Sequence, residues 1–423
     1  MLQDVTRFGF NSDGTRPTSV THALTVQLET MEFRWLLQQV RALPTSRFDR
    51  WAFECCDVFS QQVMLAAPNA MGHMGNEAFV IAVTRYFGQS SYITRSMAGL
   101  YFGKKGEQVN DNATNLCCAH LPGGGFRILH DQVKTLIITF LRLAGVEADE
   151  ESALWMLGKV RNPYMQRYTD AILHAQAENK TNPEGTIVAD FVARDFPVPT
   201  QASNDSGLGA RTDVLGEVKT LQPSKSSYDK GNCQTNRPVN LRATQAVRSY
   251  RRRAAGLDQK YAQEVVGDGT NGQVGPFETA LGEFYTGNAL PVAVGAFSEV
   301  NEDASKLITR LARLTAKTDF GKSMSPLVSH SRKGGAFPIM QSQFRRALGC
   351  LIARGQAQHL LKRRHYARPT AREAYQTAED NHSRHRNRPR ASMSGYARWW
   401  QNFIPEGYGL YQQWRNGKNF GSL

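Results

Sequence analysis

The segment GEVKT at residues 216–220 places a carboxylate and an ammonium group two positions apart within an otherwise apolar run. In a β-strand, residues i and i+2 project to the same side, so Glu217 and Lys219 share one face of the strand that we predict over 212–221. A charged pair on one strand face is a poor way to build a core. It is well suited to a site that holds a metal ion and a water molecule.

A second carboxylate lies on the strand predicted just before, in TIVADFVA at 186–193. If these two strands pair, Asp190 meets Glu217 across the ladder. Mg²⁺ prefers oxygen ligands in a tight octahedron, and such an ion activates water and stabilises the leaving oxygen of a phosphodiester. A nearby lysine orients or deprotonates that water. We therefore predict that Asp190 and Glu217 hold Mg²⁺ or Mn²⁺ and that Lys219 polarises the attacking water.

Other readings of these residues remain open. The acidic-x-Lys triplets at 178–180 and 258–260 lie in helical contexts, where positions i and i+2 do not share a face. Asp213 is a rival metal ligand, although it lies only four residues before Glu217 and would need a very tight hairpin. The alternative to a catalytic site is a surface ion pair between Glu217 and Lys219 on an edge strand.

Apolar spacing and turn residues define the expected elements along the 423 residues. Helices are predicted over 24–42, 49–66, 74–87, 130–145, 151–179 (broken at Pro163), 240–266, 302–316 and 338–363. Strands are predicted over 186–193, 212–221 and 290–297. Loops are expected at 103–115, 121–126 and 197–210, and residues 367–394 are expected to be disordered because they carry little apolar content.

The order of these elements resembles the PD-(D/E)xK restriction-like nuclease fold, whose core runs α-β-β-β-α-β. The family's proline corresponds to Ala189, and its Asp, Glu and Lys to Asp190, Glu217 and Lys219. The resemblance implies an α/β (mixed α+β) fold with this core, an all-helical N-terminal region and a basic, partly disordered C-terminal tail. The expected divisions are 1–105 (helical), 106–330 (nuclease-like, with a helical insertion near 151–180), 331–366 (basic helix) and 367–423 (tail and aromatic C-terminus).

A wider resemblance covers residues 105–300 and rests on CCAHLPGGGFRILHDQVKTLIITFLRLAGVEADEE. This order is similar to the segment that follows the reverse transcriptase in site-specific non-LTR retrotransposons. The matching residues are Cys118, Gly123, Gly124, His130, Ala144, Gly145 and Glu147. The first two cysteines of the family's Cys/His knuckle have no counterpart, and a zinc site needs about four nitrogen or sulfur ligands, so we predict no structural zinc. The chain is expected to be a fragment or a stand-alone descendant of such an element.

The charge balance indicates an anionic partner. The chain has 51 Lys and Arg against 37 Asp and Glu, a net charge of +14, which favours nucleic acid. In the helix at 240–266 the apolar stripe is expected to face the sheet and the arginines to face outward. We therefore assign nucleic-acid contact to Gln245, Arg248, Arg252, Arg253 and Lys260; the alternative is a solvated basic face. Two further basic clusters, at 362–364 and 384–390, suit non-specific contact or nuclear import.

We therefore predict a metal-dependent DNA endonuclease that hydrolyses phosphodiester bonds and derives from a retrotransposon, with RNA or an RNA–DNA duplex as other substrates left open. The alternatives are a catalytically inactive nucleic-acid-binding protein of the same fold, and a basic helical protein without a site. No apolar run reaches the length of a membrane span, the start lacks a signal-peptide pattern, and six cysteines form no disulfide framework. We therefore expect an intracellular, nuclear protein with no membrane contact; the oligomeric state is left open.

Overall fold

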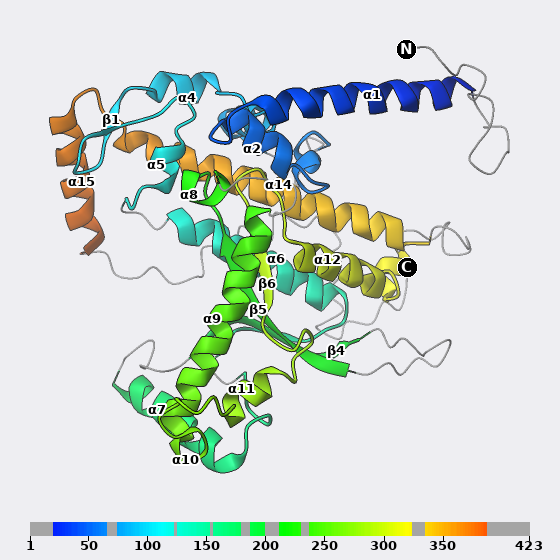
Figure 1. The fold of residues 1–423 in the computed structure, drawn as a ribbon, viewed down its shortest axis with the longest axis vertical. Helices are drawn as coiled ribbons and strands as arrows, with labels where there is room; N and C mark the ends of the chain where they lie inside the picture. Colours follow the sequence, from blue (N-terminus) through cyan, green and yellow to red (C-terminus); the bar gives the residue numbers. More distant parts are fainter. Residues whose placement is uncertain are drawn as a thin grey trace, which may run out of the picture.

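The computed structural model describes residues 20–65, 74–121, 125–152, 155–178, 187–198, 211–229, 237–323 and 335–386. Within these ranges the chain is mixed α/β, with helices packed on both faces of one small mixed sheet (Figure 1). The predicted tail beyond residue 386 and the aromatic C-terminus lie outside the described residues.

The sheet has four strands in the order β3 (Ala148–Ser152), β4 (Ala189–Pro197), β5 (Arg211–Thr220) and β6 (Leu290–Val294). β3, β4 and β5 run antiparallel to one another, while β6 is parallel to β5. β5 therefore lies inside the sheet, with a paired strand on each side. The interpretation of Glu217 and Lys219 as an edge-strand ion pair is wrong for this reason.

One face of the sheet is covered by α6 (Gly125–Leu143), α12 (Glu302–Thr315) and α14 (Phe337–Arg363). Alternate strand side chains point into this core, including Phe191, Val218 and Val292. They alternate because successive strand residues project to opposite faces. The helix predicted over 338–363 is thus present, and most of it is buried rather than forming a basic surface.

The opposite face carries α9 (Pro238–Tyr261), α7 (Asn162–Ala177) and the short helix α11 (Pro276–Leu281). Leu215 and Val192 of the strands pack here against Tyr250, Ala254 and Leu257 of α9. The buried positions of α9 recur every three or four residues, as the helical period requires. The predicted helix at 240–266 is confirmed, and it continues after Tyr261 as the short α10 (Gln263–Val266).

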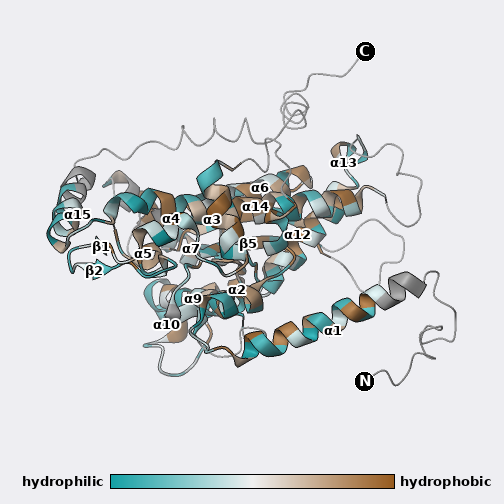
Figure 2. Cartoon of the chain, turned by 90° about the horizontal axis from the view of Figure 1, so that it is seen from above, coloured by the Kyte–Doolittle hydropathy of each residue, from teal (hydrophilic) through white to brown (hydrophobic). Residues whose placement is uncertain are grey.

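The N-terminal region forms a smaller core against the outer part of α14. Its elements are α1 (Val20–Ala42), α2 (Phe48–Cys55), a 3-10 helix (Ser60–Val63), α3 (Asn76–Tyr86), α4 (Tyr92–Met97), β1 (Tyr101–Phe102), β2 (Glu107–Gln108) and α5 (Thr114–Cys118). The β1–β2 pair means that the region is not all-helical as expected. α1 projects from the body, and Figure 2 shows polar and apolar residues along its whole surface.

Three expectations about individual segments need correction. The helix expected from residue 151 overlaps the last two residues of β3, whose exposed Asp149 and Glu150 are tolerated because β3 is an edge strand. Pro163 does not break a helix but lies in the first turn of α7, where a backbone N–H would have no hydrogen-bond partner within the helix.

The remaining elements are α8 (Lys225–Tyr228), α13 (Asp319–Ser323), a 3-10 helix (Arg364–Tyr366) and α15 (Ala371–Arg386).

α15 itself contradicts the expectation that disorder begins at residue 367. Ala374 and Ala378 are buried, and Arg368 pairs with Tyr101 of β1 just before the helix starts. Small apolar residues four positions apart give this polar segment the one packed stripe that a helix needs. No helix in the described part of the chain is long and apolar enough to cross a membrane.

The pairing of Gly216 with Phe191 yields a prediction about stability. A Cβ at Gly216 would overlap the ring of Phe191, and overpacking of a core costs about 1–3 kcal/mol. We expect Gly216→Ala to lower the urea midpoint of unfolding. Gly256→Ala is the matched control, because a Cβ at Gly256 of α9 meets nothing within 4 Å and the change should stabilise the helix by about 0.4–1 kcal/mol. Equal midpoints for both variants would contradict the close packing at Gly216.

Candidate active site

The site begins where the pairing of β4 and β5 ends. The last paired residues are Phe191 and Gly216, and the next residue toward the start of β4 is Asp190. Its carboxylate takes the place of a backbone acceptor: Oδ2 receives a hydrogen bond of 2.7 Å from the backbone N–H of Val218. This N–H would otherwise be an unsatisfied donor inside the sheet. The two strands therefore meet at a side chain, and Asp190 is fixed beside β5.

Glu217 projects from β5 toward α9 and is nearly buried, with 7% of its surface exposed. Its Oε2 accepts a hydrogen bond of 2.8 Å from the hydroxyl of Tyr250 on α9. Its Oε1 forms a short ion pair with the ammonium of Lys219, two residues along the same strand face. Burial, followed by the charge and hydrogen bond of Glu217, raises the pKa of Tyr250 well above its usual value, so the hydroxyl stays protonated and remains a donor.

His130 approaches Asp190 from α6, which covers the other face of the sheet. Its Nε2 lies 3.2 Å from Asp190 Oδ2, and its Nδ1 lies 3.1 Å from Asp131 Oδ1. Burial alone would lower the pKa of His130, but the hydrogen bonds to Asp131 and Asp190 and their charges raise it to about 9. His130 is therefore a cation at neutral pH. One turn further along α6, the fully buried Lys134 lies 2.9 Å from Glu150 Oε1 on β3.

At Asp190, neighbouring cations and hydrogen-bond donors affect the pKa more than burial does. Burial would raise the pKa of this carboxyl, but the hydrogen bond and charge of His130, the N–H of Val218 and the charge of Lys219 together lower it. Asp190 is thus ionised at neutral pH. Asp190 lies on β4 beside the backbone of Val218, and Glu217 and Lys219 lie on β5, so all three are on the strands predicted from the sequence. The structure also adds His130 and Tyr250, which the sequence reasoning did not nominate.

The donor chemistry of these residues fits a hard divalent cation. Asp190 and Glu217 supply carboxylate oxygens at adjacent strand positions. In the described ranges, no group of three or more His, Cys, Asp and Glu side chains is arranged to hold a metal ion. Mg²⁺ commonly uses only one or two carboxylates and completes its octahedron with water and substrate phosphate. Asp190 and Glu217 therefore suit a metal ion that binds together with substrate. When no metal ion is bound, Lys219 neutralises Glu217.

Asp213, the rival ligand, belongs to a different cluster near the start of β5. Four residues of strand separate it from Glu217, about 13 Å at 3.3 Å per residue. Its Oδ2 is 3.1 Å from Lys159 Nζ and 3.3 Å from Arg194 Nη1, and its Oδ1 accepts from the backbone N–H of Asp195. Burial acts to raise its pKa, but these donors and charges lower it. Asp213 is thus an ion-paired structural carboxylate.

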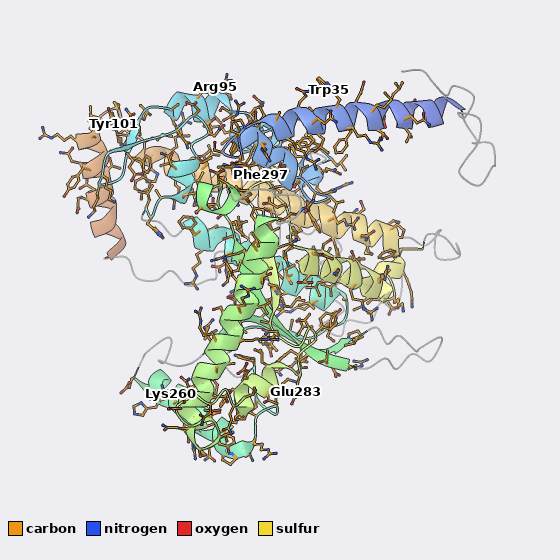
Figure 3. The ribbon with its side chains drawn as sticks, viewed as in Figure 1. Trp35, Arg95, Tyr101, Lys260, Glu283 and Phe297 are labelled. Carbon is orange, nitrogen blue, oxygen red and sulfur yellow. The ribbon has the colours of Figure 1, made fainter. Side chains whose placement is uncertain are left out.

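The residues predicted to contact nucleic acid all lie on the solvent side of α9: Gln245, Arg248, Arg252, Arg253 and Lys260. The only acidic residue of α9, Asp258, is buried and accepts hydrogen bonds from the first backbone N–H groups of α11. The exposed face of α9 therefore carries basic and uncharged side chains and no acidic one. Arg253 lies nearest the site, with its guanidinium 5.4 Å from the ring centroid of Tyr250. Lys260 lies toward the far end of the helix (Figure 3).

The predicted basic cluster at 362–364 is only partly at the surface, because Lys362 and Arg364 are exposed while Arg363 is not. Arg363 is buried and donates to the carbonyl oxygens of Leu116 and Ala119. Arg364 forms an ion pair of 3.1 Å with Glu77. These two cations hold α14 against the N-terminal region, and this explains why a run of basic residues can sit at the end of a buried helix. Residues 387–390 of the other cluster lie outside the described ranges.

Tyr250 and His130 were missed for different reasons. Tyr250 fell in the apolar stripe of its helix, where an aromatic residue usually serves only packing, and the hydroxyl partner is 33 residues away in the chain. His130 was part of the retrotransposon-like order but had no strand placement to link it with Asp190. No protein-family model, curated protein or solved structure matches the chain, so the site rests on its geometry.

The contact of His130 with two carboxylates predicts an unusual titration. In ¹³C-labelled protein, the His130 ring resonance should titrate near pH 9 rather than near the ordinary 6.5. Because the folded-state pKa is raised, the stabilisation is complete below about pH 6.5 and is lost as the pH rises through about 9. In Asp190→Asn the midpoint should move toward 6.5, since one carboxylate is gone. A midpoint near 6.5 in the wild type would contradict the His130–Asp190 pair.

Proposed function

We propose that the protein is a metal-dependent endonuclease that hydrolyses phosphodiester bonds in DNA. The observation that carries this proposal is the meeting of Asp190, Glu217 and Lys219 at the end of the β4–β5 pairing. Two carboxylates can hold a divalent cation there, and an ammonium group lies on the same strand face. Because β5 is an internal strand, it holds Glu217 and Lys219 in fixed positions. A surface ion pair would not require such a fixed arrangement.

The arrangement of elements supports a restriction-endonuclease-like core as part of the same proposal. With α7 between β3 and β4, α8 before α9, and α10 and α11 before β6 left out, the chain order α6, β3, β4, β5, α9, β6 is the order α-β-β-β-α-β, and the last two strands are parallel. The acidic residue is on the second strand and the Glu-x-Lys segment is on the third. Descent from a retrotransposon remains a proposal drawn from the residue order of the segment before the core.

Each residue has a defined part in the proposed hydrolysis. Asp190 and Glu217 would hold Mg²⁺ or Mn²⁺, and a bound ion supplies Lewis-acid stabilisation of charge on the phosphoryl oxygens. Lys219 orients and polarises the water whose oxygen bonds to phosphorus while the bond to the leaving oxygen breaks. Tyr250 fixes the rotamer of Glu217, and His130 keeps Asp190 ionised. These supporting contacts hold the site in one geometry before substrate arrives.

Binding of nucleic acid is assigned to the exposed basic face of α9. Its arginines have no acidic neighbour on the helix surface, so their charge is available to phosphate groups. Arg253 links this face to the site, because it lies over the ring of Tyr250. We also propose a nuclear location, because the chain is strongly basic.

A catalytically inactive nucleic-acid-binding protein is the second candidate. The ion pair of Lys219 with Glu217 favours it, because that contact neutralises the carboxylate that a metal would otherwise use. In this case α9 would still bind DNA, while the strand residues would serve only stability. The two candidates predict the same binding and differ in cleavage.

Nicking of supercoiled plasmid in Mg²⁺ and in Mn²⁺ separates them. Wild type should nick, and Asp190→Asn, Glu217→Gln and Lys219→Ala should each reduce the rate at least about 100-fold, the loss typical when one group acting directly on the transition state is removed. Asp213→Asn is the matched control, because it removes a carboxylate from the same strand outside the site, and it should retain the wild-type rate. EDTA should stop all cleavage.

Three other outcomes would contradict the proposed site or the proposed activity. Equal nicking by wild type and Glu217→Gln would place the chemistry elsewhere or in a contaminant. Loss of nicking in Asp213→Asn alone would make Asp213 the ligand and overturn the assignment. Plasmid retention without nicking would favour the inactive nucleic-acid-binding protein.

The basic face of α9 predicts a specific salt dependence. For duplex DNA, the slope of log K against log salt should decrease by about one for each phosphate-contacting arginine removed, so Arg248→Ala and Arg252→Ala should each lower it. Lys306→Ala is the control, since Lys306 lies on α12 and pairs with Glu302 at 2.7 Å. An unchanged slope in both arginine variants would show that α9 does not contact phosphate.

A further inference from the structure

A trough lies just beyond the end of β5, and none of Asp190, Glu217 and Lys219 lines it. Its near part, of about 520 Å³, begins at Thr220, the residue after Lys219, and is bordered by Arg242 and Gln245 of α9. Its far part, of about 710 Å³, lies between α2 and the segment before α5. Both parts are lined by Cys118, Ser224 and Ser226, so the two hollows are neighbours that share these residues. We call them together the trough.

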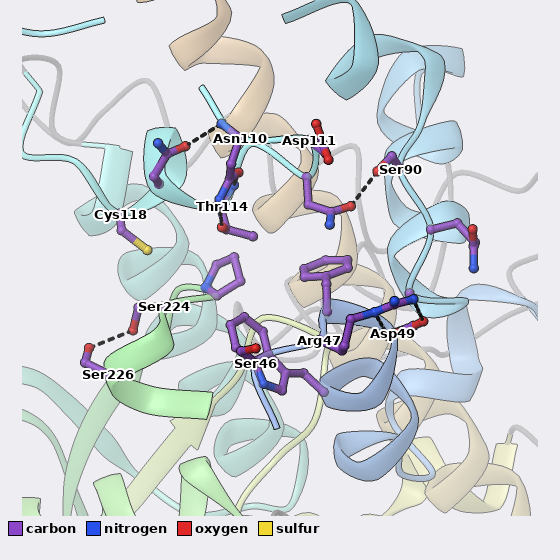
Figure 4. Close-up of a pocket in the computed structure, with 17 residues that line it drawn as sticks. Ser46, Arg47, Asp49, Ser90, Asn110, Asp111, Thr114, Cys118, Ser224 and Ser226 are labelled. Carbon is purple, nitrogen blue, oxygen red and sulfur yellow. Dashed lines mark hydrogen bonds and ion pairs between the residues drawn. The ribbon is translucent and has the colours of Figure 1, made fainter. Parts of the chain in front are cut away.

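The two parts of the trough differ in chemistry. Near the site, the guanidinium of Arg242 is held by Gln245 at 3.3 Å and supplies positive charge for phosphate. The far part is lined mainly by neutral hydroxyl and amide groups (Figure 4). The charge of Arg47 is neutralised there by Asp49, at 2.7 Å, and the exposed Asp111 adds one negative charge. Neutral amides and hydroxyls pair with the edges of nucleobases, whereas cations pair with phosphates.

The wall of the far part is held in an unusual conformation. Ala113 is fully buried and has φ of +52°, a left-handed conformation that is uncommon for residues other than glycine. It is fixed by a local network: Asn110 Nδ2 donates to Thr114 Oγ1 at 2.6 Å, and Asn110 Oδ1 accepts from the Thr114 N–H at 2.8 Å. Asn112 Oδ1 accepts from Ser90 Oγ. The amide-bearing wall is thus preorganised.

The opposite wall is equally fixed. Gly88 has φ of +67°, and any Cβ there would overlap the backbone of Asp49, so α3 and α2 can approach closely only with glycine at this point. The buried rings of Phe48 and Trp51 form the floor. The volume of each part lies in the range of about 300–1,000 Å³ that holds small organic groups. Separate nucleotides match this size, whereas a double helix needs a much wider channel.

We propose that the trough binds an unpaired nucleic-acid strand adjacent to the bond that is cut. The phosphates pass Arg242, and unstacked bases enter the far part and bond to the donors and acceptors that its amides and hydroxyls do not use within the wall. This inference rests on the proposed endonuclease function and specifies its substrate class as nucleic acid with a single-stranded stretch next to the cleavage point. Recognition of unpaired bases by their edges is common for single-stranded RNA and DNA.

Blocking the trough with a bulky side chain tests the inference. Ser226 is exposed and borders both hollows, and Ser46 is exposed on the wall of the far one. The variants Ser226→Trp and Ser46→Trp are compared with Ser323→Trp, which adds the same group to an exposed serine of α13 outside the trough. Fluorescence anisotropy in EDTA measures binding of single-stranded DNA, single-stranded RNA and a blunt duplex of the same sequence.

Both trough variants should lose at least about fivefold in affinity for single strands, the effect expected when one base contact is excluded, and should keep the wild-type affinity for duplex. Single-strand affinity equal to that of Ser323→Trp, or an equal loss for duplex, would overturn the inference. If the trough variants lose affinity for only one of the two single strands, that strand, DNA or RNA, is the one that the trough binds.

Plasmid nicking in Mg²⁺ keeps this test separate from that of the endonuclease. Selective single-strand loss without any nicking by wild type would retain the trough as a binding site and refute the nuclease. Nicking that depends on Glu217, with single-strand affinity unchanged in both trough variants, would refute the trough alone.

Discussion

The hydrogen bond from the Val218 N–H to the Asp190 carboxylate determines the architecture of the site. At this point β4 stops pairing with β5, and a buried backbone donor without a partner would cost about 1–3 kcal/mol. A side-chain carboxylate satisfies it and is thereby held between the strands. Holding that charge in a largely buried place requires nearby cations, and His130 and Lys219 supply them from opposite sides of the sheet. The same interaction thus satisfies the sheet, positions one carboxylate, and brings cations to the site.

The two faces of the sheet differ in the helices that cover them and in what those helices contribute. α6, α12 and α14 pack an apolar core against one face, so the strands that carry the site are rigid. On the other face α9 joins the core to the surface. Its buried Tyr250 holds Glu217, while Arg248, Arg251, Arg252 and Arg253 lie within one turn of Tyr250 and are exposed or partly exposed on the outer side. In the proposed function, a substrate bound by the outer face of α9 would be aligned with the buried carboxylates through one continuous helix.

The sequence predicted the elements whose residue pattern is strong and local. Alternation in β5 placed Glu217 and Lys219 on one face, and the stripe of α9 placed its arginines outward. β3 escaped prediction because its acidic residues give no apolar alternation on an edge strand, and α15 because two alanines carry its burial. Arg363 reads as a surface cation in sequence, but its partners are carbonyl groups more than 240 residues away. His130 and Tyr250 reach the site only through tertiary contacts, which no local pattern encodes.

Paramagnetic broadening by Mn²⁺ tests most directly whether Asp190 and Glu217 form a metal site. His130 Nε2 lies 3.2 Å from Asp190 Oδ2, so an ion on that carboxylate lies close to the imidazole ring. Substoichiometric Mn²⁺ should broaden the His130 ring resonance before those of other histidines in wild type and in Asp213→Asn, and should fail to do so in Glu217→Gln. Earlier broadening of a different histidine, or equal broadening of His130 in Glu217→Gln, would contradict a metal held between the two strands.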